Sequence, residues 1–267
     1  MEVAIMGKGF VGTATKYFLE EYCKDTVKKI HVEDPGYSMF ISDDDWKNVK
    51  YTFICVPTDN DGVNTHLNLT ILMKALRRAK GVPVIRSTIG PDSIVTLAMS
   101  VNHDVPLMHW PEFLREKHWQ ADVDDDSIPI IIGGQEEMTD RFVTSVLPHR
   151  NINFDRTIIE CSMKEASLMK ISRNAMLATK VAQFNMLYDL CKEYKCSYEL
   201  VKEFFKQDGT LGYTHMDVPG HDRDRGFGGK CLPKDTKHYE QLFKEHNLYS
   251  EVLDYNSTLN KCNKYSC

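Results

Sequence analysis

The first half of the chain alternates short apolar runs with longer segments of mixed polarity. Short apolar runs bounded by glycine, proline or polar clusters are typical of buried strands. Such runs predict strands at residues 3–6, 30–34, 51–56, 82–86, 105–109 and 128–134. The segments 13–21 and 67–79 between them have helical composition. Strands that alternate with helices predict an α/β fold built on a doubly wound parallel sheet.

The second half has a different pattern, from about residue 158 onward. Residues 163–194 contain neither proline nor glycine, and apolar residues recur along them at helical spacing. We expect one long connecting helix there, followed by a helix over 198–205 and a polar helical stretch over 236–264. The pattern therefore predicts an α/β domain over residues 1–155 and an all-helical central domain over residues 156–267.

Composition narrows the class of protein. The 267 residues are 42% hydrophobic, and the formal net charge is −5 with both signs mixed along the chain, so we expect no nucleic-acid partner. No apolar run has bilayer-spanning length, and the first residues carry no basic leader, which predicts a cytoplasmic protein without a membrane partner. The acidic run 122–126 is expected to be a solvated loop.

The eight cysteines do not form a recognisable metal or disulfide pattern. A chain of this size buries a full core without disulfides, so we expect reduced thiols. No Cys-x-x-Cys pair occurs and the histidines are scattered, so no metal site is expected.

A glycine-rich motif, Gly-Lys-Gly-Phe-Val-Gly, follows the first predicted strand at residues 7–12. Gly7 allows a tight turn, Gly9 lets backbone N–H groups approach a pyrophosphate, and Gly12 lets the helix pack closely on the strand. The second predicted strand ends at Asp34, where a carboxylate that binds the ribose of NAD is expected. Residues 35–37 offer no Arg or Lys for the 2′-phosphate of NADP, which supports NAD as the cofactor. A surface acid at a strand end is the alternative for Asp34.

Other cofactor contacts are expected at the carboxyl ends of the parallel strands, because ligands of such sheets bind there. The ends of the third and fourth strands carry Pro57, Thr58, Ser87 and Thr88. The segment after His109 should line the same crevice. Together with Phe10 and Val11 of the glycine motif, these residues predict a Rossmann-type NAD site.

The most distinctive stretch is Gly-Phe-Gly-Gly-Lys-Cys-Leu-Pro-Lys-Asp at residues 226–235. Glycines allow a close approach of substrate to Cys231, Pro233 fixes the turn that follows, and the carboxylate of Asp235 can reach the same space. The sequence therefore favours Cys231 as a nucleophile. The alternative is a buried cysteine beside a flexible loop, since free cysteines commonly pack as small hydrophobes.

These motifs together resemble the UDP-glucose/GDP-mannose dehydrogenase family, and within it the UDP-glucose 6-dehydrogenases. The resemblance spans almost the whole chain. It is carried by residues 7–12, 54–58, 87–89, Pro-Glu-Phe-Leu-Arg-Glu at 111–116, Lys170 with Asn174, Phe184 with Asn185, and residues 226–235.

The resemblance implies oxidation of a nucleotide sugar's primary alcohol to a carboxylate, with UDP-glucose as the default substrate and two NAD reduced. It implies a homodimer formed through the long central helix. In the roles it implies, Cys231 forms a thiohemiacetal and then a thioester. Lys170 stabilises oxyanions or shuttles the alcohol proton, and Asn174 adds a neutral hydrogen-bond donor. Asp235 and Thr88 would relay a proton or water, and Glu116, assisted by Glu112, would activate the hydrolytic water.

Without the resemblance, Lys170 and Asn174 would be interpreted as solvated groups on one helix face, and Glu112 and Glu116 as a surface pair with Arg115 or Lys117.

The sequence departs from the family pattern in ways that concern the substrate. The family continues into a third, UDP-binding domain, so this chain is expected to be a short form without it. Trp110 and Met186 replace polar residues of the family, which would alter the pocket lining, and an arginine motif of the family is replaced by residues 209–212. A charged insertion, residues 219–225, brings His221, Arg223 and Arg225 as candidate phosphate contacts. The alternatives are therefore a dehydrogenase of another nucleotide sugar, such as GDP-mannose, or of a sugar phosphate, and a non-catalytic NAD-binding or assembly module.

Overall fold

The computed structural model of the chain describes residues 1–59, 67–100, 106–147, 156–243 and 246–265. Contacts divide the chain into two compact units, of which one ends at Lys170 and the other continues from Ile171. Both residues belong to one helix, α7 (Met163–Glu193). A division into compact units need not coincide with a division into folding domains, so the boundary between residues 155 and 156 stays a prediction.

A seven-stranded sheet forms the centre of the first unit. Its order is β2-β1-β3-β4-β5-β6-β7, and it confirms the expected doubly wound α/β fold. The strands are β1 (Glu2–Met6), β2 (Lys29–Glu33), β3 (Val49–Ile54), β4 (Val82–Ile85), β5 (Met108–His109), β6 (Ile130–Gly133) and β7 (Ile158–Cys161). The chain reverses its direction of winding at β1, which pairs with β2 on one side and β3 on the other. Ligands of such sheets bind at this reversal.

Two features of the sheet differ from the prediction. All neighbouring strands are parallel except β5 and β6, which meet antiparallel through His109 and Gly133. The last strand, β7, occupies residues that the pattern assigned to the helical half. Its side chains are only half-buried or exposed, so the sequence lacks the continuous apolar run of a central strand.

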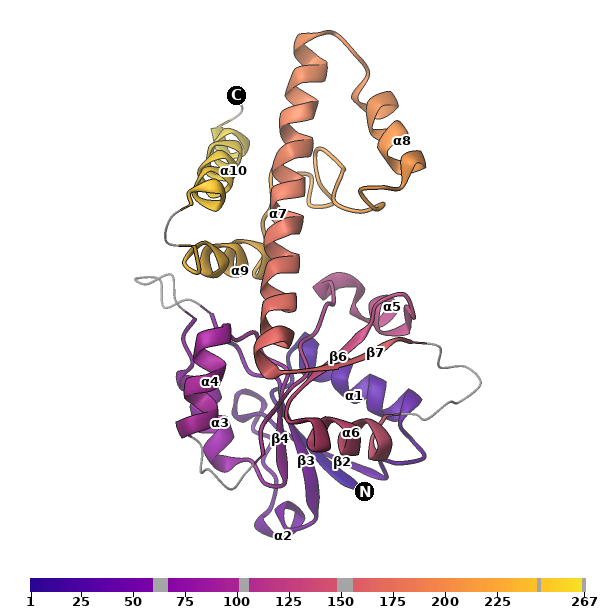
Figure 1. The fold of residues 1–267 in the computed structure, drawn as a ribbon, viewed down its shortest axis with the longest axis vertical. Helices are drawn as coiled ribbons and strands as arrows, with labels where there is room; N and C mark the ends of the chain where they lie inside the picture. Colours follow the sequence, from indigo (N-terminus) through magenta and orange to yellow (C-terminus); the bar gives the residue numbers. More distant parts are fainter. Residues whose placement is uncertain (60–66, 101–105, 148–155, 244–245, 266–267) are drawn as a thin grey trace. The chain divides into compact units, whose positions relative to one another are not determined.

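Helices cover both faces of the sheet in the first unit (Figure 1). One face carries α1 (Phe10–Tyr22), α5 (Trp119–Asp124) and α6 (Glu136–Ser145), and the other carries α2 (Asp43–Trp46), α3 (Thr70–Arg78) and α4 (Pro91–Ser100). Short 3₁₀ turns, η1 (Pro35–Tyr37) and η2 (Glu116–His118), lie after β2 and before α5.

The side chains of β1 show how the two cores arise. Val3 and Ile5 belong to the cluster under α1 and α6, whereas Ala4 and Met6 belong to the cluster under α3 and α4. Successive side chains of a strand point to opposite faces, so a strand between two helical layers must be apolar at every position. This is why the strands are continuous apolar runs in the sequence.

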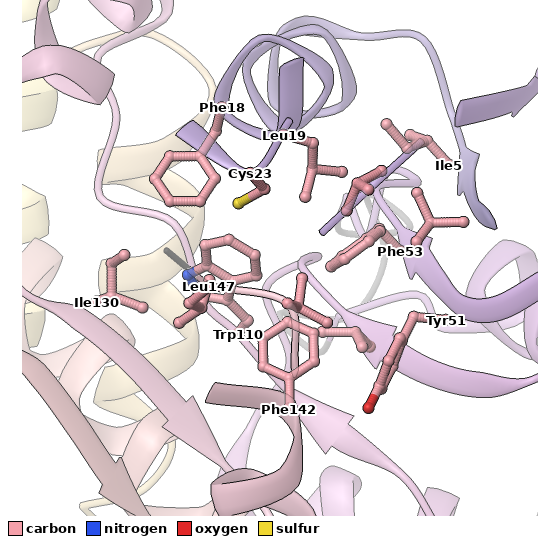
Figure 2. Packing of buried hydrophobic residues seen from close by; sticks show 14 of the residues in the cluster. Ile5, Phe18, Leu19, Cys23, Tyr51, Phe53, Trp110, Ile130, Phe142 and Leu147 are labelled. Atoms are coloured by element: carbon pink, nitrogen blue, oxygen red, sulfur yellow. The ribbon is translucent and has the colours of Figure 1, made fainter. Parts of the chain in front are cut away.

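Aromatic rings fill the core between the sheet and α1 and α6 (Figure 2). The ring of Trp110 lies with its centroid 5.9 Å from those of Phe53 and Phe142, in edge-to-face arrangements. Trp110 is only 4% exposed. The expectation that this tryptophan alters a pocket lining is therefore wrong, because its indole packs in the core.

The acidic run 122–126 is also not a solvated loop throughout. Its first residues end α5, and Asp122 is buried. The Asp122 carboxylate accepts hydrogen bonds from the backbone N–H of Arg115 at 2.6 Å and from its Nε at 3.0 Å. Burying this carboxylate is tolerated because a guanidinium pairs with it.

The second unit is helical, as expected. The long helix predicted over 163–194 is confirmed by α7, and α8 (Tyr198–Asp208) follows it. The polar helical stretch expected over 236–264 is present as two helices, α9 (Cys231–Glu240) and α10 (Leu248–Tyr265). Within this unit α8 lies on one side of α7, and α9 and α10 lie on the other (Figure 1).

Among the helices that the structure describes, none combines the length and apolar content needed to span a bilayer.

Candidate active site

The glycine turn after β1 has the shape that a pyrophosphate requires. Gly7 has φ +100°, and a Cβ there would lie 2.5 Å from the carbonyl oxygen of Cys55. A Cβ on Gly12 would lie 1.9 Å from the carbonyl oxygen of Gly7. A Cβ on Gly9, by contrast, would meet nothing within 4 Å. Gly7 and Gly12 are thus fixed by packing, while Gly9 keeps open space in front of the backbone.

The same turn leads directly into α1. Gly9 is the N-cap residue and gives no side-chain cap, and its carbonyl oxygen accepts the N–H of Thr13 at 2.9 Å. The N–H groups of Phe10, Val11 and Gly12, in the first turn, have no intrahelical acceptor. N–H groups at a helix N-terminus favour an anion. The residues present therefore fit the pyrophosphate of NAD.

Asp34 lies at the end of β2, close in space to this turn. Its Oδ2 accepts the backbone N–H of Lys8 at 2.6 Å and its Oδ1 accepts that of Gly36 at 2.9 Å. The fold also places Lys8 near this segment, which the sequence alone did not indicate. The ammonium of Lys8 lies 5.2 Å from the centroid of the Tyr37 ring, so a cation does stand beside the segment after Asp34.

The ends of β3 and β4 are joined by side-chain hydroxyls. Thr58 Oγ1 donates to the carbonyl oxygen of Thr88 at 2.7 Å, and Ser87 Oγ donates to that of Val56 at 2.6 Å. Both hydroxyl groups are thereby fixed at the carboxyl edge of the sheet. Pro57 is exposed and Thr88 is half-buried at the same edge.

A buried ion pair joins two of the predicted catalytic residues. Lys170 Nζ lies 2.9 Å from Glu112 Oε1, and both side chains are about 95% buried. Glu112 Oε2 accepts the backbone N–H of Leu114 at 2.7 Å. The alternative interpretation of Glu112 as part of a surface pair is wrong, because its side chain is buried. Glu116, four residues later, is exposed on η2.

Two further groups, Arg86 and His109, lie beside this pair, and no sequence motif identified them. The guanidinium of Arg86, at the end of β4, lies 4.0 Å from the centroid of the Trp110 ring. Burial lowers the pKa of Arg86, and its Nε and Nη1 make no hydrogen bond to the residues that the structure describes. The signal in the sequence was a lone cation at the end of an apolar run.

His109 is the second of these groups. Its Nδ1 lies 3.0 Å from the carbonyl oxygen of Ile85, and because a carbonyl can only accept, Nδ1 carries the proton. Burial, with smaller contributions from the charges of Arg86 and Lys170, lowers the pKa of His109 to about 4 against the opposing effect of that hydrogen bond. The imidazole is therefore neutral beside two cations.

In the second unit, Cys231 is the first residue of α9 rather than part of a loop. Pro233 lies in the first helical turn, where the missing N–H would have no intrahelical acceptor, so it is compatible with the helix and does not form a separate turn. Cys231 is half-buried. A helix N-terminus favours the thiolate over the thiol, since the aligned peptide dipoles leave partial positive charge there.

Asp235 lies one turn further along α9 and is completely buried. Its Oδ2 accepts a hydrogen bond from Asn174 Nδ2 at 2.6 Å, and Lys234 Nζ lies 2.9 Å from its Oδ1. The structure thus brings together two predicted catalytic residues that are 61 positions apart.

The glycine loop before Cys231 is anchored from two sides. Asn256 accepts the N–H of Phe227 at 2.7 Å and donates to its carbonyl oxygen at 3.0 Å. Arg225 Nη2 lies 2.7 Å from Asp189 Oδ2, and its Nε donates to Asn185 Oδ1 at 3.2 Å. The structure thus gives Arg225, expected as a phosphate contact, partners inside the protein. His221 and Arg223 are exposed.

Among the described residues, one group of side chains, in the first unit, has the spacing of metal ligands. Ligand atoms of Glu2, His31 and Asp45 lie within 4.8 Å of one another. Lys29 Nζ is 2.9 Å from Asp45 and 3.8 Å from Glu2, so an ammonium already supplies positive charge there. The cysteines with described side chains form no disulfide, and Cys262 and Cys267 lie outside that set.

Comparison with known proteins supports the interpretation of these motifs. Residues 164–262 match the family model described as the UDP-glucose/GDP-mannose dehydrogenase family, central domain. The UDP-glucose 6-dehydrogenase of Streptococcus pneumoniae is 25% identical over 297 residues, which cover 97% of this chain and 73% of that protein. The UDP-glucose 6-dehydrogenase of Rickettsia felis is 26% identical over 211 residues, covering 77% of this chain and 42% of that one.

The chain is similar to members of the UDP-glucose/GDP-mannose dehydrogenase family, and its residues 164–262 match the central domain of that family. It spans about half the length of the first curated relatives that it matches, with 42% and 54% of two Rickettsia enzymes covered.

Solved structures share its fold at low identity. A UDP-glucose dehydrogenase from Pyrobaculum islandicum has a TM-score of 0.78 at 20% identity, covering 97% of this chain and 68% of that chain. A UDP-D-ManNAc dehydrogenase from Pyrococcus horikoshii has a TM-score of 0.75 at 18% identity, covering 98% and 69%. This fold is thus common to dehydrogenases of different nucleotide sugars.

Proposed function

We propose that this chain is an NAD-dependent dehydrogenase that oxidises the primary alcohol of a nucleotide sugar to the carboxylate, with UDP-glucose as its substrate. The observation that carries the proposal is the contact between Asn174 and Asp235, one helical turn from Cys231. A carboxylate that is completely buried beside an amide and one ammonium contributes little to stability, because desolvation offsets the attraction. Its position next to a thiol at a helix N-terminus favours a chemical role.

The glycine turn, Asp34 and the ends of β3 and β4 would hold NAD, which takes up the hydride in each of the two oxidations. The thiolate of Cys231 would add to the aldehyde carbon of the sugar, forming a C–S bond and a thiohemiacetal. Oxidation of that adduct leaves a thioester. Water then adds to the acyl carbon, the C–S bond breaks, and the carboxylate leaves with Cys231 restored.

The remaining residues would stabilise charge and move protons. Lys170 and Asn174 are proposed to donate hydrogen bonds to the oxyanions that form on the sugar carbon. Glu116 is proposed as the base that activates the hydrolytic water, assisted by Glu112, while Thr88 and Asp235 relay a proton or water. The exposure of Glu116 on η2 is compatible with contact to solvent water.

Dehydrogenases of other sugars share the fold of this chain. The structural similarity to a UDP-D-ManNAc dehydrogenase is almost as high as that to a UDP-glucose dehydrogenase, with TM-scores of 0.75 and 0.78. A GDP-mannose dehydrogenase from Pseudomonas aeruginosa also shares the fold, with a TM-score of 0.64. We therefore propose a different nucleotide sugar as the second candidate substrate. We also propose a cytoplasmic location and a homodimer formed through α7.

The test is the stoichiometry of cofactor reduction. Purified protein is incubated with NAD and a panel of nucleotide sugars, and NADH is counted against uronic acid formed. We expect two NADH per product, turnover abolished in Cys231→Ala, and turnover retained in Cys196→Ala, a control at an exposed cysteine of the same unit. NAD binding without turnover of any sugar would contradict the enzyme and leave an NAD-binding module.

A further inference from the structure

The carboxylate of Asp34 is held in one orientation by the backbone. Lys8 N–H donates to Oδ2 at 2.6 Å and Gly36 N–H donates to Oδ1 at 2.9 Å. The loop that follows is closed by two backbone hydrogen bonds between Asp34 and Met39, at 2.9 and 3.0 Å. Both oxygens are thus fixed, and the carboxylate cannot turn away from a ligand without breaking a hydrogen bond.

A cation lies beside the same loop, which follows Asp34. Lys8 lies between Gly7 and Gly9, so its backbone belongs to the glycine turn, while its ammonium lies 5.2 Å from the centroid of the Tyr37 ring. Lys8 is exposed, and the Tyr37 ring is 64% exposed. An exposed cation over an aromatic ring gains only about 0.5–1 kcal/mol, so the ammonium can leave the ring for a stronger partner.

These two charges have opposite effects on the two nicotinamide cofactors. A carboxylate at the end of the second strand accepts hydrogen bonds from the ribose of NAD and repels the 2′-phosphate of NADP, whereas a nearby cation accommodates that phosphate. A cation that binds a phosphate forms a charge-assisted hydrogen bond, which is stronger than a cation–π contact at an exposed site.

We propose that Lys8 is a second determinant of cofactor choice, opposed to Asp34, and that it receives the 2′-phosphate of NADP once the Asp34 charge is removed. The inference rests on the proposed function, in which NAD binds at the glycine turn. Selectivity for NAD then results from the opposing effects of the Asp34 carboxylate and the Lys8 ammonium, and not from the absence of a cation.

The test is the binding of NADH and NADPH, each titrated by its fluorescence, without any sugar. Because Lys8 also lies in the turn that would hold the pyrophosphate, the readout is the ratio of the two dissociation constants. Three variants are compared with the wild type: Lys8→Gln, Asp34→Asn and the double variant that combines the two. The control combines Asp34→Asn with Lys47→Gln instead. Lys47 directly follows α2. Its side chain is 74% exposed and pairs with Asp44. Asp34→Ser keeps one acceptor for the backbone and replaces Asp34→Asn if that variant does not fold.

We expect Asp34→Asn to tighten NADPH binding relative to NADH about tenfold or more, the size of one charge-assisted hydrogen bond. Lys8→Gln should reverse most of this gain in the double variant, and Lys47→Gln should not. An equal ratio of the NADPH and NADH dissociation constants in Asp34→Asn and in the double variant, with NADH still bound by the wild type, would overturn this inference alone. Failure of the wild type to bind NADH would contradict the proposed function and the inference together.

Discussion

At the scale of a single residue, the buried neutral histidine His109, beside the cations Arg86 and Lys170, makes stability depend on pH. His109 is completely buried, and its pKa in the folded protein is lowered to about 4, chiefly by burial. In the unfolded chain an exposed histidine has a pKa of about 6.5. Between these two values the unfolded state binds a proton that the folded state does not, so the contribution of His109 is fully present above pH 6.5 and falls as the pH decreases towards 4.

We therefore predict that lowering the pH from 7 to 5 removes about 2 kcal/mol of unfolding free energy through this residue. The measurement is urea unfolding of the wild type and of His109→Asn at both pH values. The variant should be less stable at pH 7, yet it should lose about 2 kcal/mol less than the wild type between pH 7 and pH 5. Parallel losses in both proteins would mean that another group causes the acid sensitivity.

At the scale of the element, the glycine motif that leads into α1 contains one position that matters for folding and another that matters for binding. A Cβ on Gly12 would overlap the backbone of Gly7, whereas a Cβ on Gly9 would meet only open space, and Gly9 has an ordinary φ of −68°. Gly12→Ala should cost about 3 kcal/mol or more, because backbone must shift to admit the methyl group. Gly9→Ala should change stability by less than about 1 kcal/mol.

Gly12→Ala should therefore lose stability, whereas Gly9→Ala should lose cofactor affinity. We predict that Gly9→Ala keeps the thermal midpoint but weakens NADH binding about tenfold or more, since its methyl group occupies the space that the pyrophosphate would use. Thermal unfolding and NADH titration of both variants provide the measurement. Wild-type NADH affinity in Gly9→Ala would show that the cofactor does not approach the backbone at this glycine.

The success of the sequence prediction also varied by element. The strands β1 to β4 and the helix α7 could be predicted, because an apolar run or an uninterrupted helical period is a local property of the chain. The strand β7 could not, since its side chains are only partly buried. The start of α9 at Cys231 could not, because Pro233 and the preceding glycines suggest a turn while tertiary context allows proline in the first helical turn.

The sequence could name candidate site residues, but it could not give their contacts. The pairs Glu112–Lys170 and Asn174–Asp235 join residues 58 and 61 positions apart, and no local pattern encodes which carboxylate meets which partner. The same limit applies to Arg86, whose guanidinium lies over the Trp110 ring, and to Lys8, whose neighbour Tyr37 is 29 positions away.

At the scale of the whole molecule, the second unit exposes apolar side chains at regular helical spacing. On α7, Met176, Leu190 and Tyr194 are 61%, 49% and 73% exposed. Their spacing of 14 and 4 residues places them on one face of the helix. On α8, Leu200 and Phe204 are 74% and 63% exposed and lie four residues apart. Clustered exposed apolar side chains are typical of a surface that another protein covers.

We predict that the chain is a homodimer in solution and that this face of α7 forms the contact. Sedimentation equilibrium at micromolar concentration should give twice the mass of the 267-residue chain, and Leu190→Glu should raise the dissociation constant about tenfold or more, because a carboxylate would be buried without a partner. The matched control is Ile71→Glu, which adds the same charge at a 50% exposed side chain of α3 in the first unit. A monomeric wild type, or equal weakening by both variants, would contradict dimerisation through α7. A dimer that only Leu190→Glu dissociates would identify the long helix as the element that joins two copies of the chain.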